Sequence, residues 1–144
     1  MKRLFDHILL ATDGSEKNLP AVTKALEIAR TCGSALHVVY VIDDTPYTSA
    51  QTEILPADVY EKSREEGEQA VDRVRRMAGG VKMETLVLTG RPAHVITEFA
   101  ARNGVDLIVV GSQGKSGLER LLLGSTAESI IRTARCMVLV VKGA

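Results

Sequence analysis

Five short apolar runs, separated by segments with helical patterning, constrain the fold of this chain more than any other feature of it. Four of them are nearly continuous rather than alternating, which is typical of strands in a parallel sheet covered by helices on both faces. Strands are expected at 7–11, 35–42, 81–88, 107–110 and 137–141. The third run alternates more than the others, so we expect it nearer an edge of the sheet.

The segments between these strands have apolar residues at helical spacing. Helices are expected at 15–32, 57–78, 92–102 and 125–134, with an irregular stretch at 43–56. The inward-facing residues of the first two helices are expected to be Leu19, Val22, Leu26, Ala29, Tyr60, Val71, Val74 and Met77. The strict alternation of strands and helices predicts an α/β fold, in which an open parallel five-stranded sheet lies between two layers of helices.

Size and charge narrow the class of protein. The chain has 144 residues, which fits a single domain over 1–144, and its 18 basic residues balance 18 acidic ones. This balance gives no electrostatic reason to expect nucleic acid or an anionic membrane as a partner. No run approaches the roughly 20 apolar residues of a membrane span, and the apolar run near the N-terminus is too short for a signal peptide, so we expect a cytoplasmic protein. Cys32 and Cys136 are expected to be reduced and mostly buried.

The turn after the first strand is one candidate site, because ligands of open α/β sheets bind beyond the carboxyl ends of the strands. It reads Ala11-Thr12-Asp13-Gly14-Ser15. Asp13 could accept hydrogen bonds from a ligand or hold a metal. Alternatively, Asp13 forms an Asx turn that caps the next helix, with Gly14 supplying an unusual backbone angle.

The segment after the fourth strand is rich in glycine and leads to Gly124-Ser125-Thr126 at the start of the last helix. A helix N-terminus with free N–H groups favours phosphate, hydroxyl groups add donors, and Lys115 could add positive charge. Neither G-x-x-x-x-G-K-[ST] nor G-x-G-x-x-G is present. A capping box between Ser125 and Glu128 would explain those two residues without a ligand.

These residues resemble the universal stress protein family over nearly the whole chain. The resemblance is carried by HILLATDGSE, by TGRPAHVI and by the spacing G-x2-G-x9-G-[ST] at Gly111, Gly114, Gly124 and Ser125. That spacing is associated with the ATP-binding branch of the family. The resemblance implies a sheet order 3-2-1-4-5, similar to adenine-nucleotide α-hydrolase-like domains, with the strand order reversing between the first and fourth strands.

The family resemblance also implies roles for individual residues. Phosphates, often with Mg²⁺ or Mn²⁺, would be held by Gly114, Gly124, Ser125 and Thr126. The adenosine would lie near Ala11, Thr12, Asp13, the backbone of Val41 and Gly111, of which the contact at position 11 is the most variable. Family members tend to dimerise through the last strand, here Met137–Val141.

Three functions follow from this reading. The first is an ATP-binding regulatory or signalling protein of the stress response that is not a true enzyme. The second is a slow ATPase or a nucleotide-dependent transferase, although His7, His37 and His94 lie where none offers an evident general base. The third is a protein-interaction module whose nucleotide site is vestigial.

Overall fold

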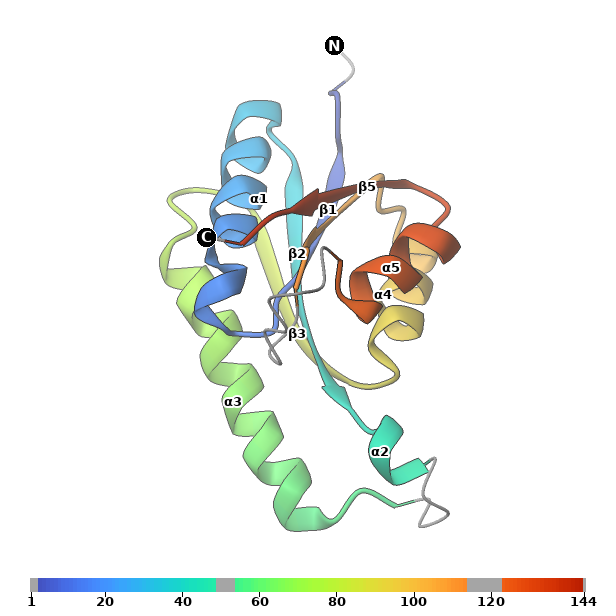
Figure 1. The fold of residues 1–144 in the computed structure, drawn as a ribbon. Coiled ribbons are helices and arrows are strands. Elements are labelled where there is room, and N and C mark those ends of the chain that lie inside the picture. Colours follow the sequence, from blue (N-terminus) through green and yellow to red (C-terminus); the bar gives the residue numbers. More distant parts are fainter. Residues whose placement is uncertain (1–2, 49–53, 114–122, 144) are drawn as a thin grey trace.

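A five-stranded parallel sheet forms the centre of the molecule in the computed structural model, which describes residues 3–48, 54–113 and 123–143 (Figure 1). Its order is β3-β2-β1-β4-β5, so the predicted α/β class, the strand order and the edge position of the third strand are confirmed. The strands are β1 (His7–Ala11), β2 (Ala35–Asp43), β3 (Met83–Gly90), β4 (Leu107–Gly111) and β5 (Met137–Val141).

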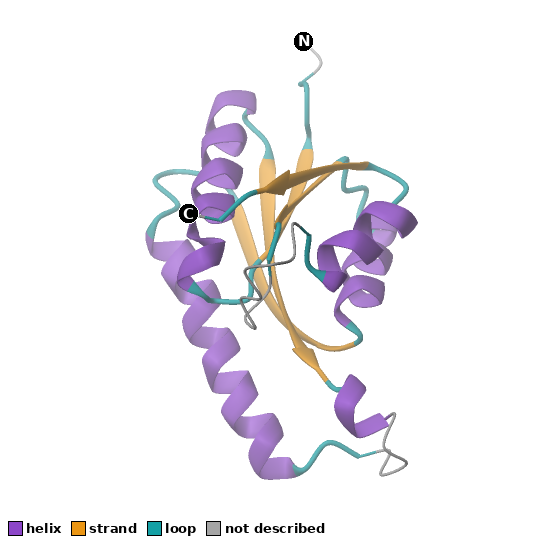
Figure 2. Cartoon of the chain, in the orientation of Figure 1, coloured by secondary structure: helices purple, strands orange, loops and turns teal. Residues whose placement is uncertain are grey.

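Helices cover both faces of this sheet, as the near-continuous apolar strands predict (Figure 2). The α1 and α3 helices lie on one face and α4 and α5 on the other (Figure 1). The helical elements are η1 (Glu16–Asn18), α1 (Leu19–Cys32), α2 (Thr45–Thr48), α3 (Ala57–Arg76), α4 (Pro92–Arg102) and α5 (Ser125–Thr133). Within the described part of the chain, no helix combines the length and the apolar character that crossing a membrane requires.

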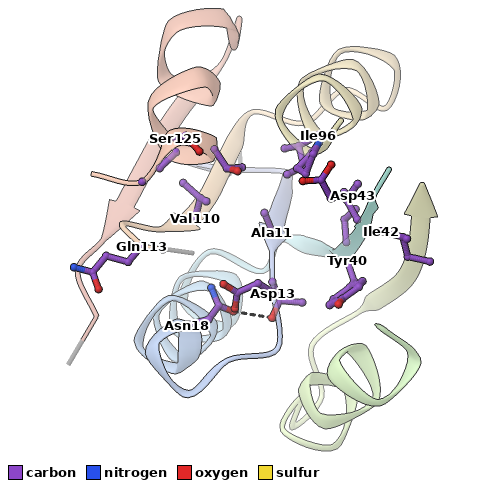
Figure 3. Close-up of a pocket in the computed structure, with 18 of the residues that line it drawn as sticks. Ala11, Asp13, Asn18, Tyr40, Ile42, Asp43, Ile96, Val110, Gln113 and Ser125 are labelled. Carbon is purple, nitrogen blue, oxygen red and sulfur yellow. Dashed lines mark hydrogen bonds between the residues drawn. The ribbon is translucent and has the colours of Figure 1, made fainter. Parts of the chain in front are cut away.

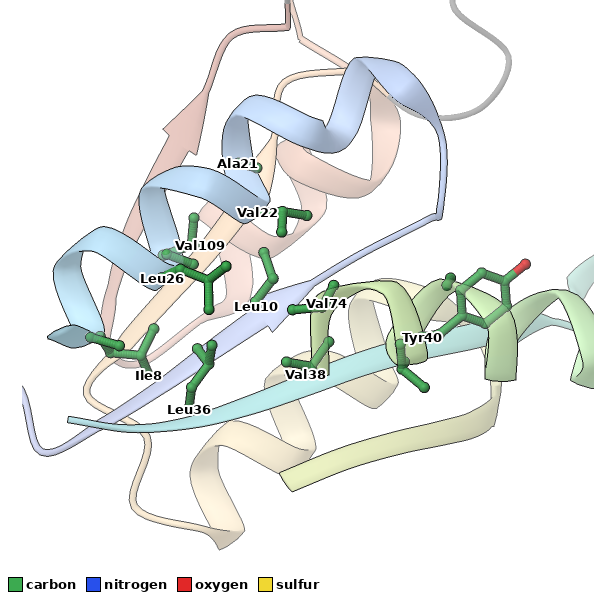
Figure 4. Close-up of a cluster of buried hydrophobic side chains, with 14 of the residues drawn as sticks. Ile8, Leu10, Ala21, Val22, Leu26, Leu36, Val38, Tyr40, Val74 and Val109 are labelled. Atoms are coloured by element: carbon green, nitrogen blue, oxygen red, sulfur yellow. The ribbon is translucent and has the colours of Figure 1, made fainter. Parts of the chain in front are cut away.

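The core consists of two layers of buried side chains, one on each face of the sheet. Because successive residues of a strand point to opposite faces, Leu10 and Val38 pack against α1 and α3, whereas Leu9 and Val39 pack against α4 and α5. Figure 4 shows the first of these layers. The central strand β1 is buried from Ile8 onward, which fixes the position of the turn that follows it.

Several expected boundaries and faces differ from the structure. The third strand begins at Met83 rather than at position 81, because Gly79 and Gly80 have positive φ and form a turn before it. The stretch at 43–56 is less irregular than expected: Asp43 extends β2, and α2 follows it. The outer residues of the expected helical stripes are exposed, since they lie at helix ends where the sheet no longer covers them; these are Leu19, Tyr60 and Met77.

Both cysteines are free, as predicted, but they are only partly buried. Cys32 is the last residue of α1 and Cys136 directly precedes β5. Burial raises the pKa of the Cys136 thiol, which lowers its reactivity at neutral pH.

The α3 helix packs closely against the turn that follows β1. A Cβ atom at Gly14 would lie 3.0 Å from Cβ of Ala70, and the Arg73 guanidinium donates a hydrogen bond of 3.0 Å to the Gly14 carbonyl. Gly14 also has a φ of 77°, which side chains other than glycine rarely adopt. The turn is thus held from outside the sheet by α3.

Replacing Gly14 by alanine should destabilise the fold by more than backbone strain alone. Gly104→Ala is a matched control, because Gly104 has a similar φ of 64° but nothing within 4 Å of the added methyl group. We expect Gly14→Ala to lower the free energy of unfolding by about 1 kcal/mol more than Gly104→Ala does, because the methyl group must displace α3. Urea denaturation measures both, and equal losses would show that the contact with α3 is unimportant.

Candidate functional site

A cavity of about 480 Å³ opens at the carboxyl ends of the strands, where the strand order reverses between β1 and β4 (Figure 3). This is where open α/β sheets bind their ligands. The cavity gathers eight of the ten residues expected at the site: Ala11, Thr12, Asp13, Val41, Gly111, Gly124, Ser125 and Thr126. The other two, Gly114 and Lys115, lie outside the described residues.

Within the described residues, the end of β2 has backbone groups at the cavity wall that do not pair with β1. The pairing of β1 with β2 ends at Ala11 and Val39, and the Val39 carbonyl accepts the N–H of Thr12 at 3.0 Å. In a parallel pair the N–H and C=O of one residue point to the same neighbour, and every second residue points the same way. The N–H and C=O of Val41 therefore point to the side of β1, beyond the residue where β1 ends. They form an adjacent donor and acceptor at the cavity wall.

The turn after β1 is an Asx turn. Asp13 Oδ1 accepts hydrogen bonds from the Ser15 N–H at 2.9 Å and from the Ser15 hydroxyl at 2.7 Å, and Gly14 has positive φ. The expected Asx turn and the unusual angle at Gly14 are therefore confirmed, but the expected helix cap is wrong, because neither η1 nor α1 has a side-chain cap. Because Asp13 also lines the cavity, this structural role holds its carboxylate at the site.

The N-terminus of α5 forms the opposite end of the cavity. The expected capping box between Ser125 and Glu128 is wrong, because the N-cap residue is Gly124 and the helix has no side-chain cap. Ser125 is already helical, and Glu128 instead pairs with Arg132 at 2.5 Å. Gly124 is fixed by its N–H, which donates to the Ser112 carbonyl at 2.5 Å. A helix N-terminus without a side-chain cap leaves N–H groups available to an anion.

Two further groups of residues at the cavity were missed by sequence reasoning. Asn18, at the end of η1, lies at the cavity and is only 3% exposed. On the side of α3, the cavity is lined by Ser63 and Glu66, which the sequence pattern placed in a solvated charged face. No spacing in the sequence relates either group to the strand ends, because tertiary packing brings η1 and the first half of α3 to the cavity.

The three histidines lie outside the cavity lining. The His37 ring lies 5.7 Å from that of His7 and 5.6 Å from that of Phe99, and its Nδ1 is 3.3 Å from Glu84 Oε1. These contacts give His37 a structural environment. Among the residues at 3–48, 54–113 and 123–143, no three His, Cys, Asp or Glu side chains are grouped so as to hold a metal ion.

Comparison with known proteins agrees with this geometry. A universal stress protein of Methanocaldococcus jannaschii is 43% identical to the chain over 98% of the chain and 84% of its own length. The structure of the universal stress protein UspA from Lactobacillus plantarum superposes with a TM-score of 0.79 at 28% identity, covering 98% of this chain and 99% of that one. A universal stress protein solved in complex with cAMP superposes with a TM-score of 0.68 at 26% identity, covering 97% and 98%.

The model of the universal stress protein family matches residues 4–142, which is nearly the full length of the chain. The sheet order expected for that family is also the one observed. The chain belongs to the universal stress protein family.

Proposed function

We propose that this protein binds an adenine nucleotide, ATP in particular, and acts as a nucleotide-dependent regulatory protein in stress response. One observation carries the proposal: within the described residues, one cavity has a backbone donor and acceptor at Val41 that do not pair with β1, and a helix N-terminus at Gly124 without a side-chain cap. The backbone groups of Val41 can pair with the edge of a nucleotide base, and the helix N-terminus can bind a phosphate. That a family member was solved with cAMP, an adenine nucleotide, supports the choice of ligand.

The base would bind along β2. Adenine offers a ring-nitrogen acceptor and an amino donor, which the N–H and C=O of Val41 can pair with. Apolar side chains from both sides of this wall would cover the faces of the ring, as is usual in pockets for small molecules. Apolar residues that line the cavity include Ala11, Val39, Ile96 and Val110.

The phosphates would bind at α5. The Gly124 N–H already donates to the Ser112 carbonyl, so the donors would be the next N–H groups at the start of α5 and the hydroxyl groups of Ser125 and Thr126. The helix dipole favours the negative charge. Gly114 and Lys115 would complete this end of the site, with a backbone N–H group and a positive charge. Mg²⁺ or Mn²⁺ would then be carried mainly by phosphate oxygens and water, so it needs few ligands from the protein.

The site favours binding over turnover. General-base catalysis needs a proton acceptor within hydrogen-bond reach of the attacking water. The histidines lie outside the cavity lining, and two of its carboxylates, those of Asp13 and Asp43, already accept hydrogen bonds from the Ser15 and Thr45 N–H groups. Bound nucleotide would therefore act as a sensed ligand that fixes the loops around it. Slow hydrolysis would require a water activated by Asp13 through a metal ion.

The protein would act in the cytoplasm as a homodimer. The β5 strand is an edge of the sheet, and Met137 at its start is 68% exposed. Pairing with a second copy through Met137–Val141 would cover an edge that is otherwise open to uncontrolled strand pairing.

The Gly124→Val substitution tests the two ends of the site separately. Gly124 has φ −69° and ψ 159°, which valine adopts without strain, so the fold should remain intact. In calorimetric titrations of nucleotide-free protein, we expect about one ATP per wild-type chain and an ATP affinity at least about tenfold lower in the variant. Adenosine is the internal control, because it lacks phosphates and should bind both proteins equally.

The outcomes of that titration separate the alternatives. Equal affinity of both proteins for ATP would show that the phosphates do not bind at the N-terminus of α5. A variant that loses adenosine as well as ATP would show a collapsed cavity rather than a lost phosphate contact. A wild type that binds no nucleotide would contradict the proposed function.

A further inference from the structure

We propose that Asn18 is a positioning residue of the nucleotide site, which sets the separation of the turn after β1 from the end of β4 and so determines nucleotide affinity. The inference rests on the proposed function of the same cavity. Asn18 is the last residue of η1 and is buried at the point where β1 and β4 diverge. Figure 3 shows its side chain at the cavity between Gln113 and Asp13.

On one side, Asn18 holds Thr12. The Thr12 hydroxyl donates a buried hydrogen bond of 2.7 Å to Asn18 Oδ1 and accepts the N–H of Gly14 at 3.2 Å. A hydroxyl group has one hydrogen to donate, so that of Thr12 is already used within the protein. The Thr12 side chain therefore serves the site by fixing the turn, and Asn18 is the residue that holds it.

On the other side, the Asn18 amide packs against the end of β4. Its Nδ2 lies 3.2 Å from the position that a Cβ atom would occupy on Gly111, so a side chain there would push the amide away by a few tenths of an ångström. One side-chain amide thus contacts both loops of the crevice. The length of the Asn18 side chain therefore sets the distance between the turn after β1, which would hold adenosine, and the end of β4, which leads to the phosphate end of the site.

The orientation of Asn18 shows that helix capping is not its role. Asn18 is the N-cap residue of α1, where an asparagine usually accepts a hydrogen bond from the first turn of its helix. The α1 helix has no such bond: the backbone of Asn18 is helical, at φ −83° and ψ −15°, and its Oδ1 accepts the Thr12 hydroxyl instead. The buried hydrogen bond therefore uses the side-chain oxygen that a helix cap would need.

A double-mutant cycle tests this role. Asn18→Ala and Thr12→Val remove the same hydrogen bond from its two ends, and each should weaken ATP binding about tenfold in calorimetry, because the turn is no longer held at its place in the cavity. The loss of affinity in the double variant should be clearly smaller than the sum of the two single losses, since the Thr12–Asn18 bond is common to both. Only the Gly14 N–H bond to Thr12 and the contact of Asn18 with Gly111 are specific to one single variant. Valine has nearly the same shape as threonine, so Thr12→Val alone is used for the test if Asn18→Ala does not fold.

Ser34→Ala is the matched control. Ser34 is also 3% exposed, and its hydroxyl donates a hydrogen bond of 2.5 Å to the Phe5 carbonyl at the opposite end of the sheet. We expect it to lower the melting temperature without nucleotide, as the other variants do, while leaving ATP affinity unchanged. ATP affinity in the Asn18 and Thr12 variants equal to that of Ser34→Ala would overturn the inference alone. A wild type that binds no ATP would overturn the proposed function and this inference with it.

Discussion

The difference in length between β1 and β2 is the constraint on which the site depends. The central strand has five residues and its neighbour nine, and their pairing ends at Ala11 and Val39. Beyond that point, the backbone groups of β2 no longer pair with β1. On the other side of β1, the strand order reverses toward β4. A parallel sheet satisfies its backbone groups between strands, so a strand that ends early leaves hydrogen-bonding groups for a ligand.

Close contacts and hydrogen bonds hold the elements around this opening in place. The α3 helix packs on the Asx turn through Gly14, and Asn18 joins the same turn to Gly111. At the far end, the Ser112 carbonyl fixes Gly124 at the start of α5. Each of these contacts places backbone N–H groups or a carboxylate at the cavity, so the packing of the fold and the preorganisation of the site are the same set of interactions.

The sequence predicts the framework well and the details of the site less well. Apolar runs locate all five strands because burial on both faces leaves a strong pattern, and the family resemblance supplies the strand order. The capping box at Ser125 was wrong because a four-residue spacing does not say where a helix begins; Gly124 occupies that position. Sequence reasoning missed Asn18 because no residue pattern marks its bond with Thr12, and its contact with the distant Gly111 depends on tertiary packing.

The most direct test of the central claim is a ¹⁵N-labelled NMR titration with ATP, after assignment of the backbone amides. The account predicts that the largest shift changes fall on amides that line the cavity, namely those of residues 11–13, 41, 111 and 124–126. The amide of Val41 should respond to adenosine alone, whereas those of Ser125 and Thr126 should need the phosphates. Changes confined to another face of the molecule, or no saturable change, would contradict the claim that the opening beyond β1 is a nucleotide site.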